Sequence, residues 1–88
     1  MKYKILLHPK VNTFLKNIDL ELKKRITKKL RELKDKPEKG KKLRYSDFWR
    51  IRIGEYRAIY EINKKDKQII ILYIGHRKKV YDDFTRLI

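Results

Sequence analysis

The stretch that decides the fold is WRIRIGEYRAIY, residues 49–60. It predicts two short strands joined by a tight turn at Gly54. Because successive side chains of a strand point to opposite faces, Arg50 and Arg52 share one face while the apolar residues around them face the other way. Arg57 follows directly across the turn. The stretch therefore predicts a stiff hairpin that carries three guanidinium groups, each a permanent cation whose planar donors suit phosphate.

The first half of the chain predicts a strand followed by two helices. Residues 2–8 alternate at first between basic and apolar residues, which is typical of a strand. An apolar stripe then predicts a helix over about 9–18, with Pro9 in its first turn. Asp19 is a candidate N-cap for a second helix, whose apolar stripe continues to about Lys36. Two helices joined so closely form an antiparallel hairpin.

The second half predicts a sheet and a last helix. Residues 35–44 have the composition of a charged loop, and a helical pattern returns over about 80–88. Residues 69–74 are apolar on both faces, which favours a central strand. Strands are expected at about 46–53, 56–62 and 68–74. We therefore predict a single α+β domain over residues 1–88, in which a helical hairpin packs on a mainly antiparallel four-stranded sheet in the order β-α-α-β-β-β-α.

The composition points to a partner with negative charge. The 88 residues include 26 Lys and Arg against 11 Asp and Glu, which gives a net charge of +15. Such an excess favours nucleic acid or another acidic polymer as the partner. With no cysteine, only two histidines and no acidic cluster, the sequence predicts neither a metal site nor a cofactor. The apolar run near the N-terminus is too short for a signal peptide or a membrane span, so we expect a cytoplasmic protein.

A second block of residues that could take part in a reaction, GHRKKVY at residues 75–81, follows directly on the predicted central strand. If the last three strands form a meander, Arg77 comes to lie near Arg57. His76 is a candidate for proton transfer, although a lone histidine near a strand end is more often a packed residue. Tyr81 shares a helix face with apolar residues, so core packing is the alternative to a role beside the arginines.

Basic residues also cover the second predicted helix, and both basic clusters have a second interpretation. The arginines of the hairpin either solvate the outer face of a sheet or bind a polyanion, and their spacing alone does not choose between the two. For the helix, non-specific phosphate binding is the simplest interpretation, and it specifies no sequence. The residues predicted to contact nucleic acid on this helix are Lys23, Lys24, Arg25, Lys28, Lys29 and Arg31.

The element order and the two blocks together resemble the RelE/ParE superfamily of toxins, and more closely its RelE branch, the ribosome-dependent mRNA interferases. The resemblance spans the whole chain. It implies a type II toxin that an acidic, RelB-like antitoxin neutralises in a hetero-oligomer. It also implies that the free toxin enters the ribosomal A site and acts as a metal-independent endoribonuclease on the bound mRNA, which inhibits translation. Carried over residue by residue, the catalytic site of the family falls on Arg50, Arg52, Arg57, Arg77 and Tyr81.

The sequence departs from the family pattern on the second strand, where some relatives carry lysines. Both positions are arginine here, and because arginine stays protonated, Arg52 suits clamping rather than general-base catalysis. His76 is the candidate for proton transfer, with Glu55 and Glu61 as candidate carboxylates. Two other functions stay open: a ParE-type inhibitor that binds DNA gyrase without catalysis, and a plain RNA-binding module.

Overall fold

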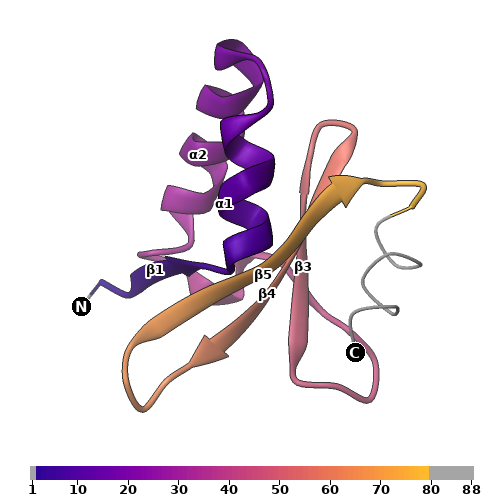
Figure 1. The fold of residues 1–88 in the computed structure, drawn as a ribbon. Coiled ribbons are helices and arrows are strands. Elements are labelled where there is room, and N and C mark those ends of the chain that lie inside the picture. The colour runs from indigo at the N-terminus through magenta and orange to yellow at the C-terminus, as the bar shows by residue number, and fades with distance from the viewer. Residues whose placement is uncertain (1, 80–88) are drawn as a thin grey trace.

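Two helices cover one face of a five-stranded sheet in the structure, a computed structural model that describes residues 2–79 (Figure 1). The elements in chain order are β1 (Lys4–Leu7), α1 (Pro9–Lys16), α2 (Leu20–Glu32), the 3₁₀-helix η1 (Pro37–Lys39), β2 (Lys41–Lys42), β3 (Phe48–Ile53), β4 (Tyr56–Asn63) and β5 (Gln68–His76). The strands lie in the order β1-β5-β4-β3-β2, with β1 parallel to β5 and all other neighbours antiparallel. The last predicted helix, residues 80–88, lies outside the described residues.

The structure confirms the α+β class, the helical hairpin and the mainly antiparallel sheet. The predicted number of four strands was wrong, and so was the prediction that residues 35–44 form only a loop. That segment contains η1 and the short strand β2, whose Lys41 lies opposite Arg50 of β3. Backbone amide and carbonyl groups make this pairing, so two lysines join the sheet without an alternating apolar pattern. The additional strand brings basic side chains of the segment next to the arginine hairpin.

Both helices begin where the sequence predicts and end a few residues earlier than predicted. Pro9 is the first residue of α1, and Asp19 Oδ1 accepts a hydrogen bond from Leu22 N at 2.9 Å as the N-cap of α2. Leu33 follows α2 but is fully buried. The apolar spacing therefore continues beyond the last helical residue, which explains the longer prediction for α2.

The main core lies between the two helices and the sheet. Tyr60 is fully buried in it, and its ring stacks on Trp49 with 6.3 Å between centroids. We call the opposite face of the sheet, away from the helices, the outer face. It carries a smaller apolar cluster, in which Leu43, Phe48, Leu72 and Tyr73 pack around the buried Ile59. The buried residues of the main core are Val11, Leu15, Ile26, Leu30, Leu33, Ile51, Ile53, Ala58, Tyr60, Ile69, Ile71 and Ile74.

Candidate active site

The three arginines of the β3–β4 hairpin share the outer face of the sheet. The register places Arg52 directly opposite Arg57, and Arg50 is the preceding residue of β3 on the same face. Ile51 and Ala58, which alternate with the arginines along the two strands, belong to the core on the helix side. The Cβ atoms of two directly opposed residues in an antiparallel pair lie about 4.5–5.5 Å apart. The hairpin is therefore anchored by its apolar side and presents its guanidinium groups together on the other.

These arginines line a surface hollow of about 380 Å³ together with three lysines. The lysines come from α2, η1 and β2 and the arginines from β3 and β4, so the hollow collects cations from five separate elements. The lining residues are Lys29, Lys39, Gly40, Lys41, Arg50, Ile51, Arg52 and Arg57. None of them is acidic. A concave surface lined by charge of one sign concentrates oppositely charged ligands, so the hollow suits a polyanion.

Glu32 of α2 offsets part of this charge without lining the hollow. Its carboxylate forms an ion pair with Lys39 and lies 4.0 Å from Lys29 Nζ. The hydrogen bond from Lys39 is the main cause of the lowered pKa of the Glu32 carboxyl, and nearby lysines contribute further. Charge-assisted contacts of this kind restrain long side chains. Lys39, one of the three lysines of the hollow, is thus partly held in place by this carboxylate.

A neighbouring hollow of about 410 Å³ connects the arginine cluster to helix α2. Lys29 and Arg52 line both hollows. Arg25 reaches the turn of the hairpin, because its Nη2 lies 3.2 Å from the position that a Cβ would take at Gly54. Lys28 also lines this second hollow. Arg25, Lys28 and Lys29, half of the predicted basic helix surface, therefore adjoin the arginine hairpin directly.

The other predicted cations of α2 lie on a third hollow, of about 590 Å³, along the outer surface of the helix. Lys23, Lys24 and Arg31 line it, and Lys28 contributes to it as well as to the second hollow. Glu32 and Asp35 also line it, so its charge is mixed. The basic surface of α2 thus forms two parts, of which the one beside the hairpin is continuous with the arginine cluster.

Residues 75–79, the described part of the second sequence block, lie at the same end of the sheet as the hairpin turn (Figure 1). Arg77 N donates a hydrogen bond to Glu55 O at 2.8 Å, and Gly75 lies opposite Arg57 in the register. The backbone of Arg77 is therefore next to the turn of the arginine hairpin, as the meander order predicts. Tyr81 lies outside the described residues, and its place in the site stays a prediction.

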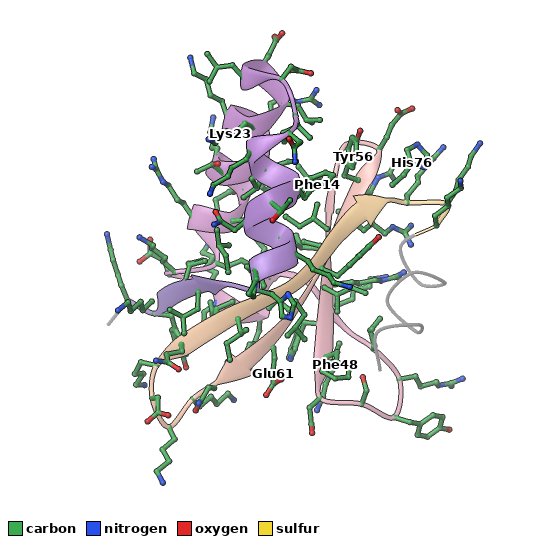
Figure 2. The ribbon with its side chains drawn as sticks, viewed as in Figure 1. Phe14, Lys23, Phe48, Tyr56, Glu61 and His76 are labelled. Carbon is green, nitrogen blue, oxygen red and sulfur yellow. The ribbon has the colours of Figure 1, made fainter. Side chains whose placement is uncertain are left out.

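The ring of His76 packs on the helix side of the sheet. His76 lies opposite Tyr56 with 5.9 Å between ring centroids, and the Tyr56 ring is 6.0 Å from Phe14 of α1 (Figure 2). Its Nδ1 accepts a hydrogen bond from Lys78 N at 3.3 Å. Arg57, the neighbour of Tyr56 in the chain, belongs to the outer face. The sheet thus lies between the imidazole and the arginines, and proton transfer by His76 stays a prediction.

Tyr73 is a candidate that the sequence did not single out. A Cβ at Gly75 would lie 2.7 Å from Cε1 of the Tyr73 ring, so the ring leans over this glycine. Because Gly75 is the register partner of Arg57, the tyrosine ring is adjacent to the arginine cluster on the outer face. In the sequence Tyr73 is hidden in an apolar run. A glycine inside a strand, which often marks a close approach of another group, was the signal that could have revealed it.

A buried tyrosine holds the lysine-bearing segment 37–41 against the sheet. The Tyr60 hydroxyl donates a hydrogen bond to Pro37 O at 2.8 Å and accepts one from Gly40 N at 3.1 Å. Both bonds are made from inside the core, on the side of the sheet that the helices cover. We call this arrangement the Tyr60 clasp. It fixes the backbone between η1 and β2. The backbone positions of the two lysines that line the hollow from this segment are thereby fixed as well.

The clasp makes stability depend on pH above about pH 10. Burial raises the pKa of Tyr60 above its ordinary value of 10.0 and outweighs the opposing hydrogen bond from Gly40 N–H. The stabilising contribution of the neutral hydroxyl is therefore complete below about pH 10 and is lost as the pH rises through the raised pKa of the folded state. We expect the free energy of unfolding to fall more steeply above pH 10 in the wild type than in Tyr60→Phe.

Urea unfolding of both proteins at several values between pH 8 and pH 11 measures this difference. At pH 8, Tyr60→Phe should be less stable by about 1–3 kcal/mol, because Gly40 N–H loses its partner. The remaining tyrosines titrate in both proteins and cancel in the comparison. Parallel curves for the two proteins would mean that the hydroxyl does not carry the pH dependence.

Two further properties concern only residues 2–79. Neither helix of this part of the chain is long and apolar enough to cross a membrane. In the same part, no three His, Asp or Glu side chains are grouped so that they could hold a metal ion.

The fold is that of the RelE-like toxins. The RelE of an archaeal RelE–RelB complex from Pyrococcus horikoshii is 30% identical, with a TM-score of 0.74 over 91% of this chain and 100% of that chain. A RelB–RelE antitoxin–toxin complex from Methanococcus jannaschii gives 29% identity and a TM-score of 0.68 over 90% and 98%. A mutant of the Escherichia coli toxin RelE in the free state is 19% identical, with a TM-score of 0.81 over 100% of this chain and 99% of that chain. The last likeness shows the fold alone.

The sequence defines the family. Residues 5–81 match the sequence model described as the ParE toxin of the type II toxin–antitoxin system parDE. The chain therefore belongs to the RelE/ParE superfamily of type II toxins. Among curated proteins, none matches the chain by sequence.

Proposed function

We propose that this toxin is a ribosome-dependent endoribonuclease that cleaves mRNA in the A site and so inhibits translation. The observation that carries the proposal is the hollow in which Arg50, Arg52 and Arg57 meet three lysines and no acid. A site whose charged lining residues are all arginine or lysine suits a ligand with closely spaced phosphates. Three arginines are more than a small sheet face needs for solvation. The planar guanidinium group of each also binds phosphate in a defined orientation.

The proposed reaction is attack by a ribose 2′-hydroxyl on the adjacent phosphate. The 2′-oxygen forms a bond to phosphorus while the bond to the 5′-oxygen breaks, which yields a 2′,3′-cyclic phosphate and a 5′-hydroxyl. Negative charge builds on the non-bridging oxygens in the pentacovalent transition state. Preorganised donors that bind this state more tightly than the ground state lower the barrier, by roughly 3–4 kcal/mol for each donor if they resemble those of an oxyanion hole.

The residues have separate roles in this proposal. Arg57 and Arg77 contact the scissile phosphate, whereas Arg50 and Arg52 hold the mRNA backbone and stabilise charge. Tyr81 orients a base or moves a proton, and Tyr73 is a further candidate for these two tasks because its ring adjoins Arg57 through Gly75. His76 remains a candidate for proton transfer only if its ring leaves the contact with Tyr56. The ribosome supplies the bent conformation of the mRNA.

A cytoplasmic complex with an acidic, RelB-like antitoxin is part of the proposal. The related toxins from Pyrococcus horikoshii and Methanococcus jannaschii are found in complexes of RelE with RelB. The net charge of +15 here favours an acidic partner, since complementary charge steers association and suppresses wrong partners. Such a partner and the mRNA would compete for the same cations.

The second candidate function is inhibition of DNA gyrase without catalysis, which the match to the ParE sequence model favours. Expression of the toxin alone separates the two. Mapping of mRNA 5′ ends should reveal new 5′-hydroxyl ends within codons after induction of an endoribonuclease. A gyrase inhibitor would leave mRNA intact and induce the DNA damage response, and a plain RNA-binding protein would do neither.

The basic surface of α2 should contribute to binding without contributing to the reaction. Removal of the charges at Lys24, Lys28 and Arg31 by glutamine should flatten the log–log dependence of RNA affinity on salt by roughly 2–3 units, because three phosphate contacts are lost. Fluorescence anisotropy with a labelled RNA between 50 and 300 mM salt measures the slope.

A matched variant controls for net charge. Glutamine at Lys10, Lys16 and Lys65, three exposed lysines that are not part of α2, removes the same charge from other elements. Its slope should change much less. Equal slopes for both triple variants would show that the surface of α2 only contributes to the overall charge.

A further inference from the structure

An exposed tyrosine stands at the tip of the turn between β2 and β3. Tyr45 is 97% exposed, compared with 65% for Leu20 and 39% for Leu7, the other exposed large apolar side chains among the described residues. A single exposed aromatic residue needs no explanation by itself. The backbone conformation of the turn sets this tyrosine apart.

The turn is built so that the tyrosine stays outside. Leu43 N donates a hydrogen bond to Phe48 O at 2.8 Å and closes the turn. Inside it, Ser46 Oγ donates to Leu43 O at 3.0 Å and accepts from Phe48 N at 3.2 Å. Tyr45 itself has a φ of 58°, in the left-handed region where glycine or asparagine is less strained than an aromatic residue. The turn thus holds an aromatic ring outward at a cost in stability, which is a common property of functional positions.

Arg44 adds a cation to the ring. Its guanidinium carbon lies 5.7 Å from the centroid of the Tyr45 ring, which is a cation–π distance. An exposed aromatic face next to a guanidinium group is what proteins use to stack an unpaired base and hold its phosphate. Asp47 is the acidic residue of the same turn, and it is exposed as well. The tip therefore carries charge of both signs around one flat ring.

The paired strands β2 and β3 connect the tip of the turn to the arginine cluster. Phe48 at the base of the turn precedes Arg50 by two residues, or about 7 Å along β3. Lys41, opposite Arg50 on β2, lines the cationic hollow. A few nucleotides of single-stranded nucleic acid suffice to reach from the turn to the cluster, and single-strand sites as short as about four nucleotides are known in OB-folds.

We propose that Tyr45 and Arg44 form a stacking site for one unpaired RNA base, a few nucleotides away from the phosphate held by the arginine cluster. The identity of the ligand as RNA rests on the proposed function. A protein partner fits this surface less well, because an interface core needs contiguous apolar area, whereas this single ring has charged neighbours. The site would fix the direction in which the RNA crosses the outer face.

Asparagine at position 45 is the informative substitution, because it removes the ring and suits the left-handed backbone. Tyr45→Asn should keep or raise the Tm. It should weaken binding of a single-stranded RNA of about ten nucleotides, made uncleavable with 2′-O-methyl riboses, by about 5- to 150-fold, the range measured for loss of one stacked base. Tyr45→Phe keeps the ring and should bind like the wild type.

Two further readings separate stacking from charge. The log–log salt slope of Tyr45→Asn should equal that of the wild type, because no phosphate contact is lost. Binding to duplex RNA, in which the bases are paired, should not change. Unchanged single-strand affinity, or an equal loss for single-strand and duplex RNA, would overturn the proposal.

The outcome also distinguishes this site from the proposed function. A wild type that binds the RNA but cleaves no mRNA on induction removes the endoribonuclease proposal and leaves the stacking site standing. A wild type that does not bind single-stranded RNA removes the stacking site, whereas the endoribonuclease proposal is decided by the mapped mRNA 5′ ends alone. Unaltered RNA binding combined with weaker binding of the co-expressed antitoxin would assign the turn to the protein partner and overturn the stacking site.

Discussion

Replacement of Arg57 by alanine should lower the rate of mRNA cleavage by about 10²- to 10³-fold, because it removes a preorganised donor to the transition state. The protein should stay folded, since Arg57 is half-buried on the outer face of the sheet and does not belong to the hydrophobic core. Arg77→Ala should behave in the same way. Growth arrest on induction, cleavage of ribosome-bound mRNA and urea unfolding of the purified variants measure these effects.

Two controls make this result specific. Lys65→Ala removes the same charge from the exposed turn between β4 and β5 and should leave cleavage unchanged. Arg57→Lys keeps the charge but loses the planar fork, so its rate should lie between those of Arg57→Ala and the wild type. Full activity of both Arg57→Ala and Arg77→Ala would show that the scissile phosphate is bound elsewhere.

The sequence predicted the elements whose side chains follow a regular period. The helices have apolar stripes and local start signals such as Pro9 and Asp19, and these depend only on neighbouring residues. Strand alternation also predicted that Arg50 and Arg52 lie on the face opposite to the apolar residues of the hairpin. Their assembly with Arg57 follows from a short turn, which fixes the register of the two strands.

The sequence did not predict features that depend on register and on backbone pairing. Lys41 enters the site because β2 pairs with β3, and a strand of two lysines has no pattern that would reveal it. The placement of His76 on the helix side depends on which residue of β5 lies opposite Tyr56, and the irregularity between Ile59 and Tyr60 shifts that register. A single-residue shift moves every side chain to the other face, so such positions are hidden until the pairing is known.

The Tyr60 clasp is the strongest case of a hidden constraint, and Gly40 is its most sensitive point. Gly40 has extended backbone angles, so its conformation does not require glycine. The space does: a Cβ at this position would lie 2.1 Å from the backbone oxygen of Arg50 and 2.7 Å from the Tyr60 hydroxyl. The oxygen belongs to the strand that carries the arginines and cannot move without disturbing β3.

Gly40→Ala should therefore be the most destabilising of the substitutions considered, by on the order of 3 kcal/mol. This value combines about 1–3 kcal/mol for overpacking with about 1–3 kcal/mol for a buried hydroxyl that loses its partners. The Tm should fall by roughly 12–24 °C, at about 4–8 °C for each kcal/mol in a domain of this size. Urea and thermal unfolding measure both quantities. Affinity for RNA should fall as well, since the backbone of Lys39 and Lys41 is no longer held in place.

Gly54→Ala is the matched control for this prediction. Gly54 has a φ of 61° and needs glycine for its backbone, but a Cβ there meets only the end of the flexible Arg25 side chain, at 3.2 Å. Its substitution should cost only about 1 kcal/mol, the usual cost of the left-handed conformation. If Gly40→Ala is no less stable than Gly54→Ala, segment 37–41 does not pack against β3 as closely as the clasp requires, and the lysines of the hollow are not held from inside the core.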